Sequence, residues 1–178
     1  MRFALPLVVG FFSWTFLEYV LHRWVMHGGK GRNEMSREHL QHHVSPSYFA
    51  PTLKKLAATI PAFSAMGAVL AVPTSPLTGA LWAVGITLGW MTYEVIHRRI
   101  HVAGPLNGYG RWARRHHLHH HFHAFKNHGV TVPLWDWVFG TLEAPAVVRV
   151  PRKQAVRFPW LVDGEAIAAR HADDYSIV

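Results

Sequence analysis

Long apolar stretches alternate along this chain with short polar segments that are rich in histidine. Three stretches are apolar enough to be considered as membrane spans, at residues 3–21, 56–72 and 77–95. A helix needs about 20 residues to cross a bilayer, within a range of roughly 17–25, so the second stretch is short. Pro73 and Pro76 lie between the second and third stretches, where a tight link would close a helical hairpin. The pattern predicts an all-α integral membrane protein with about three transmembrane helices.

Composition agrees with a membrane location. Half of the residues are hydrophobic and only 16% are charged, below the roughly 25% of a soluble domain. The net charge of +8 comes from basic residues beside the apolar stretches, which fits the cytoplasmic face of a membrane and argues against nucleic acid as a partner. The chain has no cysteine, which excludes a disulfide framework, a thiolate zinc site and a cysteine nucleophile.

Most of the 15 histidines fall in four short clusters with the spacing of metal ligands. The clusters are His22-x4-His27, His39-x2-His42-His43, His97-x3-His101 and a dense run from His116 to His123. Imidazole is the commonest neutral metal ligand in proteins. So many imidazoles in a chain without cysteine predict a nitrogen-rich transition-metal site that holds more than one ion.

Helical spacing places several of these histidines on shared faces, because positions i, i+3 and i+4 are neighbours on a helix. The second and third clusters fit that rule directly. The last run fits it twice, as His116, His119 and His120 or as His117, His120 and His121. His22 and His27 lie about 140° apart on an ideal α-helix. That pair either flanks an ion or meets through a local π-bulge.

Three spans would bring all four clusters to one membrane face. Spans two and three cross the membrane and return, so the two clusters before that hairpin and the two clusters after it lie on the same side. Of the 18 lysines and arginines, only Arg2 would lie on the opposite side. The positive-inside rule then predicts that the histidine face is cytoplasmic.

Two carboxylates, Glu18 and Glu94, each precede a histidine by about one helical turn at the end of a span. One interpretation is that each carboxylate accepts an imidazole N–H and fixes the tautomer of that ring. The other is that Glu18 pairs with Arg23 and Glu94 with Arg98. The sequence leaves both open.

The order of the clusters over residues 14–142 resembles the fatty acid hydroxylase superfamily, which includes fatty acid 2-hydroxylases, sterol desaturases and bacterial β-carotene hydroxylases. The most specific pieces are Glu18-Tyr19-x2-His22-Arg23-x3-His27, His39-Leu40-Gln41-His42-His43, His117-x2-His120-His121-Phe122 and Gly129-Val130-Thr131-x2-Leu134-Trp135-Asp136-x-Val138-Phe139-Gly140-Thr141.

The resemblance implies a membrane oxygenase that uses two iron ions and O2 to attack an aliphatic C–H bond, with zinc as a substitute in isolated protein. The register ending at His121 is preferred because an aromatic residue, Phe122, follows it. The implied catalytic and metal-binding residues are His22, His27, His39, His42, His43, His97, His101, His117, His120 and His121. We expect His116, His119, His123 and His128 to face solvent or to support these ligands.

The expected function is therefore O2-dependent hydroxylation of a membrane lipid, either a fatty acyl chain or a sterol-like substrate. Carotenoid hydroxylation and lipid desaturation are alternatives within the superfamily. A membrane protein that binds or transports transition metals is an alternative of another class, but transport needs ionisable residues inside the spans, and their middles lack them.

Electrons must come from a soluble donor such as a ferredoxin or a cytochrome b5-like protein, because the chain carries no flavin, haem or iron–sulfur motif. We expect a multi-pass protein of a bacterial inner membrane. Residues 1–142 would form the hydroxylase domain, with the metal site in a cytoplasmic helical cap, and 143–178 a polar C-terminal extension. We expect Arg111, Arg114 and Arg115 to meet lipid headgroups, with docking of an acidic electron donor as the alternative.

Overall fold

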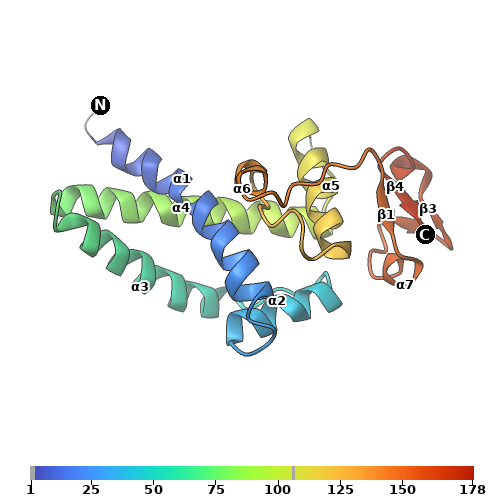
Figure 1. Cartoon of the computed structure of the whole chain (residues 1–178), viewed down its shortest axis with the longest axis horizontal. Helices are drawn as coiled ribbons and strands as arrows, with labels where there is room; N and C mark the ends of the chain where they lie inside the picture. The colour runs from blue at the N-terminus through green and yellow to red at the C-terminus, as the bar shows by residue number, and fades with distance from the viewer. Residues whose placement is uncertain (1–2, 106) are drawn as a thin grey trace.

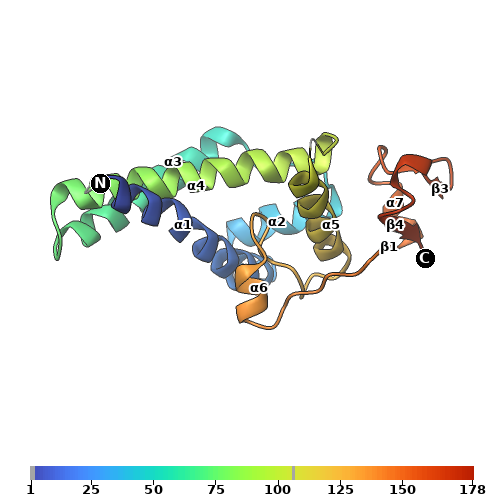
Figure 2. The same cartoon turned by 90° about the horizontal axis from the view of Figure 1, so that it is seen from above.

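The computed structural model describes residues 3–105 and 107–178, so Arg2 lies outside the described residues. The chain is mostly helical, and its long axis runs from the turn between α3 and α4 to the C-terminal end (Figures 1 and 2). The helices are α1 (Ala4–Val20), a π-helix (Leu21–His27), α2 (Glu34–Val44), α3 (Thr52–Ala71), α4 (Pro76–Val102), α5 (Gly108–Phe122), α6 (Leu134–Val138), α7 (Arg152–Ala155) and a 3-10 turn (Ala169–His171). The strands are β1 (Val148–Val150), β2 (Val162–Asp163), β3 (Ala166–Ile167) and β4 (Tyr175–Ile177).

Capping side chains mark where the helices begin. The side-chain oxygens of Asn33, Ser75 and Asn107 each accept an N–H from the first turn of the helix that follows, at 2.8, 3.1 and 2.8 Å. Such caps satisfy backbone donors that have no partner within the helix. The caps fix the starts of α2, α4 and α5, the helices that carry most of the clustered histidines.

Helices α1, α3 and α4 pack closely because glycines line their contacts. A Cβ atom at Gly85 of α4 would lie 2.1 Å from the carbonyl oxygen of Leu7 in α1. A Cβ at Gly79 would lie 2.1 Å from the carbonyl oxygen of Gly67 in α3. Small residues allow this approach, which is common between helices in membranes.

Two helical segments are long and apolar enough to cross a membrane, Ala4–His27 and Thr52–Ala71. Their surfaces expose large apolar side chains such as Phe12 and Val69, as expected of lipid-facing helices. The third stretch forms α4, which is 27 residues long and makes the expected hairpin with α3. The mostly helical architecture is thus confirmed, while a third crossing by α4 stays a prediction.

The all-α prediction is wrong for the C-terminal unit, which we define as residues 143–178. This unit contains a parallel pair, β1–β4, and an antiparallel pair, β2–β3. Strands of two or three residues are too short to leave an alternating pattern in the sequence. The unit also has buried apolar side chains, among them Val148, Phe158 and Leu161, that pack with Leu118 of α5.

Candidate metal centre

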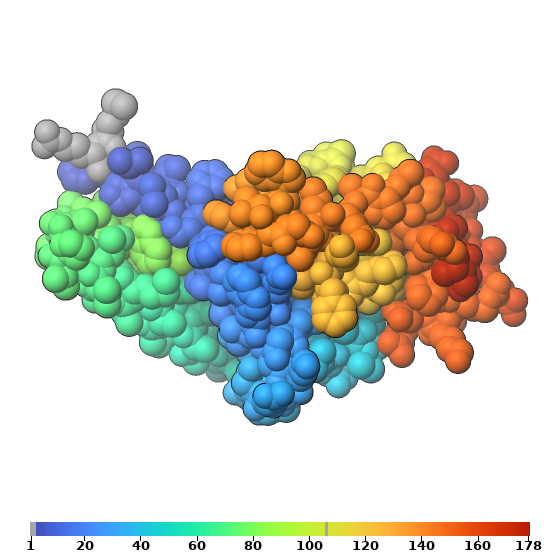
Figure 3. Space-filling model, viewed as in Figure 1, coloured from blue at the N-terminus to red at the C-terminus, as the bar shows by residue number. Residues whose placement is uncertain are grey.

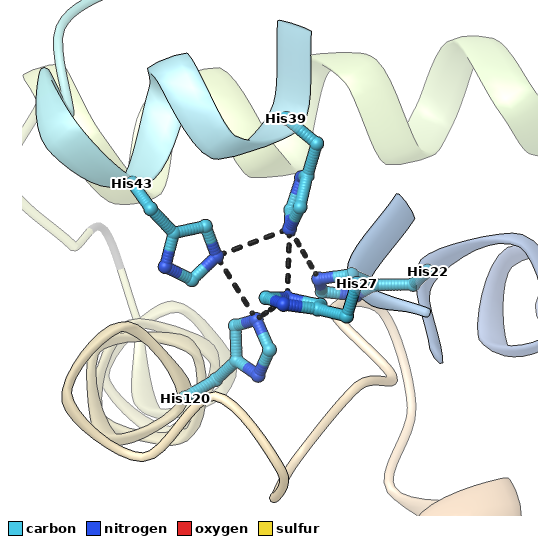
Figure 4. Close-up of side chains that lie close together, drawn as sticks. All are labelled: His22, His27, His39, His43 and His120. Carbon is cyan, nitrogen blue, oxygen red and sulfur yellow. Dashed lines mark hydrogen bonds between the residues drawn. The ribbon is translucent and has the colours of Figure 1, made fainter. Parts of the chain in front are cut away.

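The ten histidines that the superfamily pattern singled out lie together in two groups of five. The first group is His22, His27, His39, His43 and His120, and the second is His42, His97, His101, His117 and His121. In each group, one ring nitrogen per residue lies within 4.8 Å of the corresponding atoms of the other four. Figure 4 shows the rings of the first group converging from the π-helix, α2 and α5.

In the first group, His39 is the central member. Its Nε2 lies 3.1 Å from Nε2 of His22, 2.9 Å from that of His27 and 3.0 Å from that of His43. The Nε2 of His120 closes the group, at 3.0 Å from His27 and 3.2 Å from His43.

In the second group, His117 has the central place. Its Nε2 lies 3.0 Å from Nε2 of His97, 3.0 Å from that of His101 and 3.1 Å from that of His121. The Nε2 of His42 lies 3.1 Å from that of His101. The two groups therefore have nearly the same internal spacing.

Helical geometry explains how neighbours in sequence serve different groups. Successive side chains on an α-helix point about 100° apart, so the adjacent pairs His42–His43 and His120–His121 each contribute one ring to each group. Helices α2 and α5 thus contribute to both groups. The structure brings the register ending at His121 into the groups. It also places His22 and His27 on a π-helix, the second of the two arrangements that their spacing allowed.

Burial keeps these imidazoles neutral. It lowers the pKa of His42 to about 4 and, together with neighbouring histidines, lowers that of His43 to about 3. Burial also holds the pKa values of His117 and His120 well below the ordinary value of 6.5. A neutral imidazole has a lone pair available for a metal ion, so the site is prepared for cations at physiological pH.

Backbone carbonyls orient three of the rings. The Nδ1–H of His22 donates to the carbonyl of His128 at 2.5 Å, and that of His120 donates to the carbonyl of Lys126 at 2.6 Å. In the second group, Nδ1–H of His42 donates to the carbonyl of Tyr48 at 2.8 Å. Because Nδ1 carries the proton in these rings, the lone pair lies on Nε2 and points into the group.

Two buried carboxylates hold the segment that supplies two of those carbonyls. Asp136 accepts the backbone N–H groups of His128 and Gly129 at 2.7 and 2.8 Å and the hydroxyl of Thr141 at 2.7 Å. Glu18 accepts the backbone N–H of Val130 and the N–H and hydroxyl of the next residue. Helix α6, which supplies Asp136, lies against α1 on the face shown in Figure 3. We call Glu18 and Asp136 the carboxylate clamp.

The structure supports neither interpretation of Glu18 and Glu94. Glu18 binds backbone amides, and Arg23 donates instead to the hydroxyl of Tyr19 at 2.7 Å. Glu94 pairs with Lys55 of α3 rather than with a histidine or with Arg98. The residues that Glu18 binds were visible in the sequence, because Gly129-Val130-Thr131 belongs to the most distinctive motif. The contact itself could not be predicted, because it joins residues more than 100 positions apart.

The remaining clustered histidines are less exposed than expected. His116, His119 and His128 are buried. The Nε2 of His116 lies 3.4 Å from a carboxylate oxygen of Asp136, and His119 bonds to Glu143 at 2.9 Å. Of the two roles expected for them, burial excludes a solvent-facing one for these three, and their contacts support the segment around the first group.

The basic residues of α5 bind the C-terminal unit. Arg111 and Arg115 lie 2.7 and 3.4 Å from the carboxylate of Asp174. The guanidinium of Arg114 lies over the ring of Trp160, 4.0 Å from its centroid. Their expected contact with lipid headgroups stays a prediction.

The sequence profile of the fatty acid hydroxylase family matches residues 7–141, which include all ten grouped histidines and the clamp. The chain belongs to the fatty acid hydroxylase family. A dihydroceramide fatty acyl 2-hydroxylase of Arabidopsis thaliana is 37% identical over 160 residues, covering 84% of this chain and 64% of that protein. The fatty acid 2-hydroxylase of Mus musculus is 32% identical over 148 residues, covering 76% of this chain and 38% of that protein.

A solved structure of the same family also resembles the chain. It is full-length scs7p with only its hydroxylase domain visible, and it matches with a TM-score of 0.63 at 27% identity. The match covers 81% of this chain and 57% of that one. The chain thus spans less than two thirds of the length of these relatives. Family membership and the two histidine groups together indicate a metal cofactor.

Proposed function

We propose that this protein is an O2-dependent hydroxylase of membrane lipids whose two histidine groups each bind one iron ion. The observation that carries the proposal is the convergence of ten imidazoles, eight of them buried, into two groups of equal size. Membership of the fatty acid hydroxylase family supports the reaction class.

The spacing within each group fits a shared ion. Neighbouring Nε2 atoms within a group lie between 2.9 and 3.2 Å apart, at a distance where their lone pairs repel unless a cation lies between them. Two nitrogens bound at right angles through bonds of about 2.1 Å are about 3.0 Å apart, whereas tetrahedral ligands are about 3.4 Å apart. Five donors also exceed the four of a structural zinc site. The groups therefore fit an ion with more than four ligands.

The bound metal would supply the oxidising chemistry for an aliphatic C–H bond, which side chains cannot provide, and this requires a redox-active ion such as iron rather than zinc. The protein's own residues do the rest. The imidazoles stay neutral, and the carbonyls of Lys126, His128 and Tyr48 hold three of them in place. His117 and His120 have no exposed surface, so their ring nitrogens are shielded from water.

The substrate we propose is the fatty acyl chain of a membrane lipid. The similar proteins named above are fatty acyl and fatty acid 2-hydroxylases. Exposed apolar side chains along α1 and α3 would let an acyl chain approach from the bilayer. In this proposal α4 is a third span, the histidine groups lie on the cytoplasmic side of a bacterial inner membrane, and a soluble ferredoxin or cytochrome b5-like carrier delivers electrons.

The test compares His120→Ala with His123→Ala in membranes supplied with 18O2, a reduced carrier and fatty acyl lipids. His120 belongs to the first group, whereas His123, on the same stretch of chain, lies outside both groups. Wild type and His123→Ala should incorporate one 18O atom per product, detected by mass spectrometry, and His120→Ala should incorporate none. Full product formation by His120→Ala would overturn the proposal, and an unsaturated product without 18O would assign desaturation instead.

A further inference from the structure

The C-terminal unit lies outside residues 7–141, yet it reaches the second histidine group. It occupies the end of the molecule opposite the α3–α4 turn, beside α5 (Figures 1 and 2). Its Phe158 is 2% exposed, and the ring centroid lies 6.3 Å from that of His101 and 6.2 Å from that of His121. An aromatic side chain from this unit therefore covers one side of the group.

A second residue of the unit binds the end of α4. The indole N–H of Trp160 donates to the carbonyl oxygen of His101 at 2.9 Å. The last carbonyls of a helix have no partner within the helix, so this bond satisfies a group that would otherwise be left open. The guanidinium of Arg114 stacks over the Trp160 ring. The contact fixes the backbone of a residue whose ring belongs to the second group.

Within the part of the chain that the structure describes, two rings of the second group have no polar partner that orients them. Among the described residues, Nδ1 of His101 and Nδ1 of His117 are buried without a hydrogen-bond partner. In the first group, backbone carbonyls hold the corresponding atoms of His22 and His120. The orientation of His101 must therefore come from its neighbours, and Phe158 lies nearly parallel to it, at an interplanar angle of 21°.

Several contacts attach the C-terminal unit to α5 and hold Phe158 beside His101. Asp174 bonds to Arg111 at 2.7 Å, and Arg115 donates to the carbonyls of Pro145 and Ala146 at 2.7 and 2.5 Å. The apolar cluster that includes Phe158 continues into α5 through Leu118. Helix α5 thus carries both histidine ligands and the attachment of the unit that covers them.

We propose that the C-terminal unit closes the second histidine group, with Phe158 and Trp160 as positioning residues that hold His101 and keep water from its metal ion. The inference rests on the proposed function only in that both histidine groups bind metal. It assigns the two ions different protection: the second depends on Phe158 and Trp160, and the first does not.

The test measures metal release from the full chain loaded with two Co2+ ions and mixed with excess chelator. Phe158→Ala should release one ion roughly 10–100-fold faster than wild type and the other at the wild-type rate, because supporting contacts contribute that much to metal affinity. Phe158→Leu should restore most of the protection. Trp160→Phe keeps an aromatic ring but removes the pyrrole part of the indole with its N–H, so one ion should leave about tenfold faster. Val156→Ala is the control, since Val156 is 70% exposed in the same segment.

Each outcome decides between the two claims. Wild-type release of both ions from Phe158→Ala and Trp160→Phe would overturn the role of the C-terminal unit and leave the hydroxylase proposal standing. Equal acceleration of both ions would also overturn it, since the effect would then be a general loss of structure. If Phe158→Ala does not fold, Trp160→Phe decides alone. A wild-type chain that binds fewer than two ions would instead contradict the proposed function, and with it this inference.

Discussion

Asp136→Asn tests the carboxylate clamp with little change in side-chain size. The carboxylate accepts three hydrogen bonds, two on Oδ1 and one on Oδ2. Asparagine offers one oxygen and one N–H donor group. Placed with its oxygen toward His128 and Thr141, the amide presents an N–H to the N–H of Gly129. At least one hydrogen bond is therefore lost in every orientation.

The expected loss of folding stability follows from the one hydrogen bond that is lost. Burial acts to raise the pKa of Asp136, but the rings of His116 and His128, the Thr141 hydroxyl and the Gly129 amide outweigh it, so the pKa falls below its ordinary value and the group is ionised. Losing one hydrogen bond to a charged group costs about 1.5–3 kcal/mol. For a chain of this size that lowers the melting temperature by about 3–12 °C. The carbonyl of His128 also shifts, which loosens the ring of His22.

The assay combines thermal unfolding in detergent with metal release into chelator. Asp136→Asn should unfold at a lower temperature and release the ion of the first group roughly 10–100-fold faster. Asp163→Asn is the matched control, because Asp163 is exposed in the C-terminal unit. An unchanged melting temperature together with wild-type release of both ions would refute the clamp.

Three further predictions test helix packing, protonation and metal removal. Gly85→Val should destabilise the chain by about 1–3 kcal/mol, because its Cβ would meet the backbone of α1, whereas Gly104→Val has open space and should shift the melting temperature little. The metal-free chain should lose stability as the pH falls from about 6.5 toward 3. The reason is that the folded pKa values of His42 and His43 are about 4 and 3, so the unfolded chain binds more protons in that window. Chemical unfolding measures this stability, and a free energy of unfolding that does not change with pH would contradict the prediction. Chelation of both ions should lower the melting temperature in proportion to metal affinity, and saturating metal should restore it; a melting temperature that does not respond to metal would count against the site.

The ten grouped histidines could be selected from sequence because helical spacing and the superfamily motif point to the same residues. Their division into two groups could not. His42 and His43 are adjacent in sequence and lie in different groups, and only the placement of α2 between the two groups decides this. The π-helix at 21–27 was one of two arrangements that the sequence allowed, and tertiary packing selects it.

The contacts around the groups were harder to predict because they join distant parts of the chain. Glu18 binds backbone amides at 130 and 131, and no spacing rule connects these positions. Trp160 and Phe158 come from a unit with very short strands and no motif, so the sequence predicted a polar extension where the structure has a buried aromatic contact. Backbone carbonyls that orient imidazoles, such as that of His128, leave no trace in residue identity.

The central claim is that two iron ions occupy the two histidine groups, and metal content with Mössbauer spectroscopy tests it most directly. Detergent-purified protein loaded with iron should contain two irons per chain and give the signal of a coupled diferric pair. Firmly bound zinc that iron cannot replace, or a single labile ion per chain, would contradict the account and favour a protein that binds or transports metal.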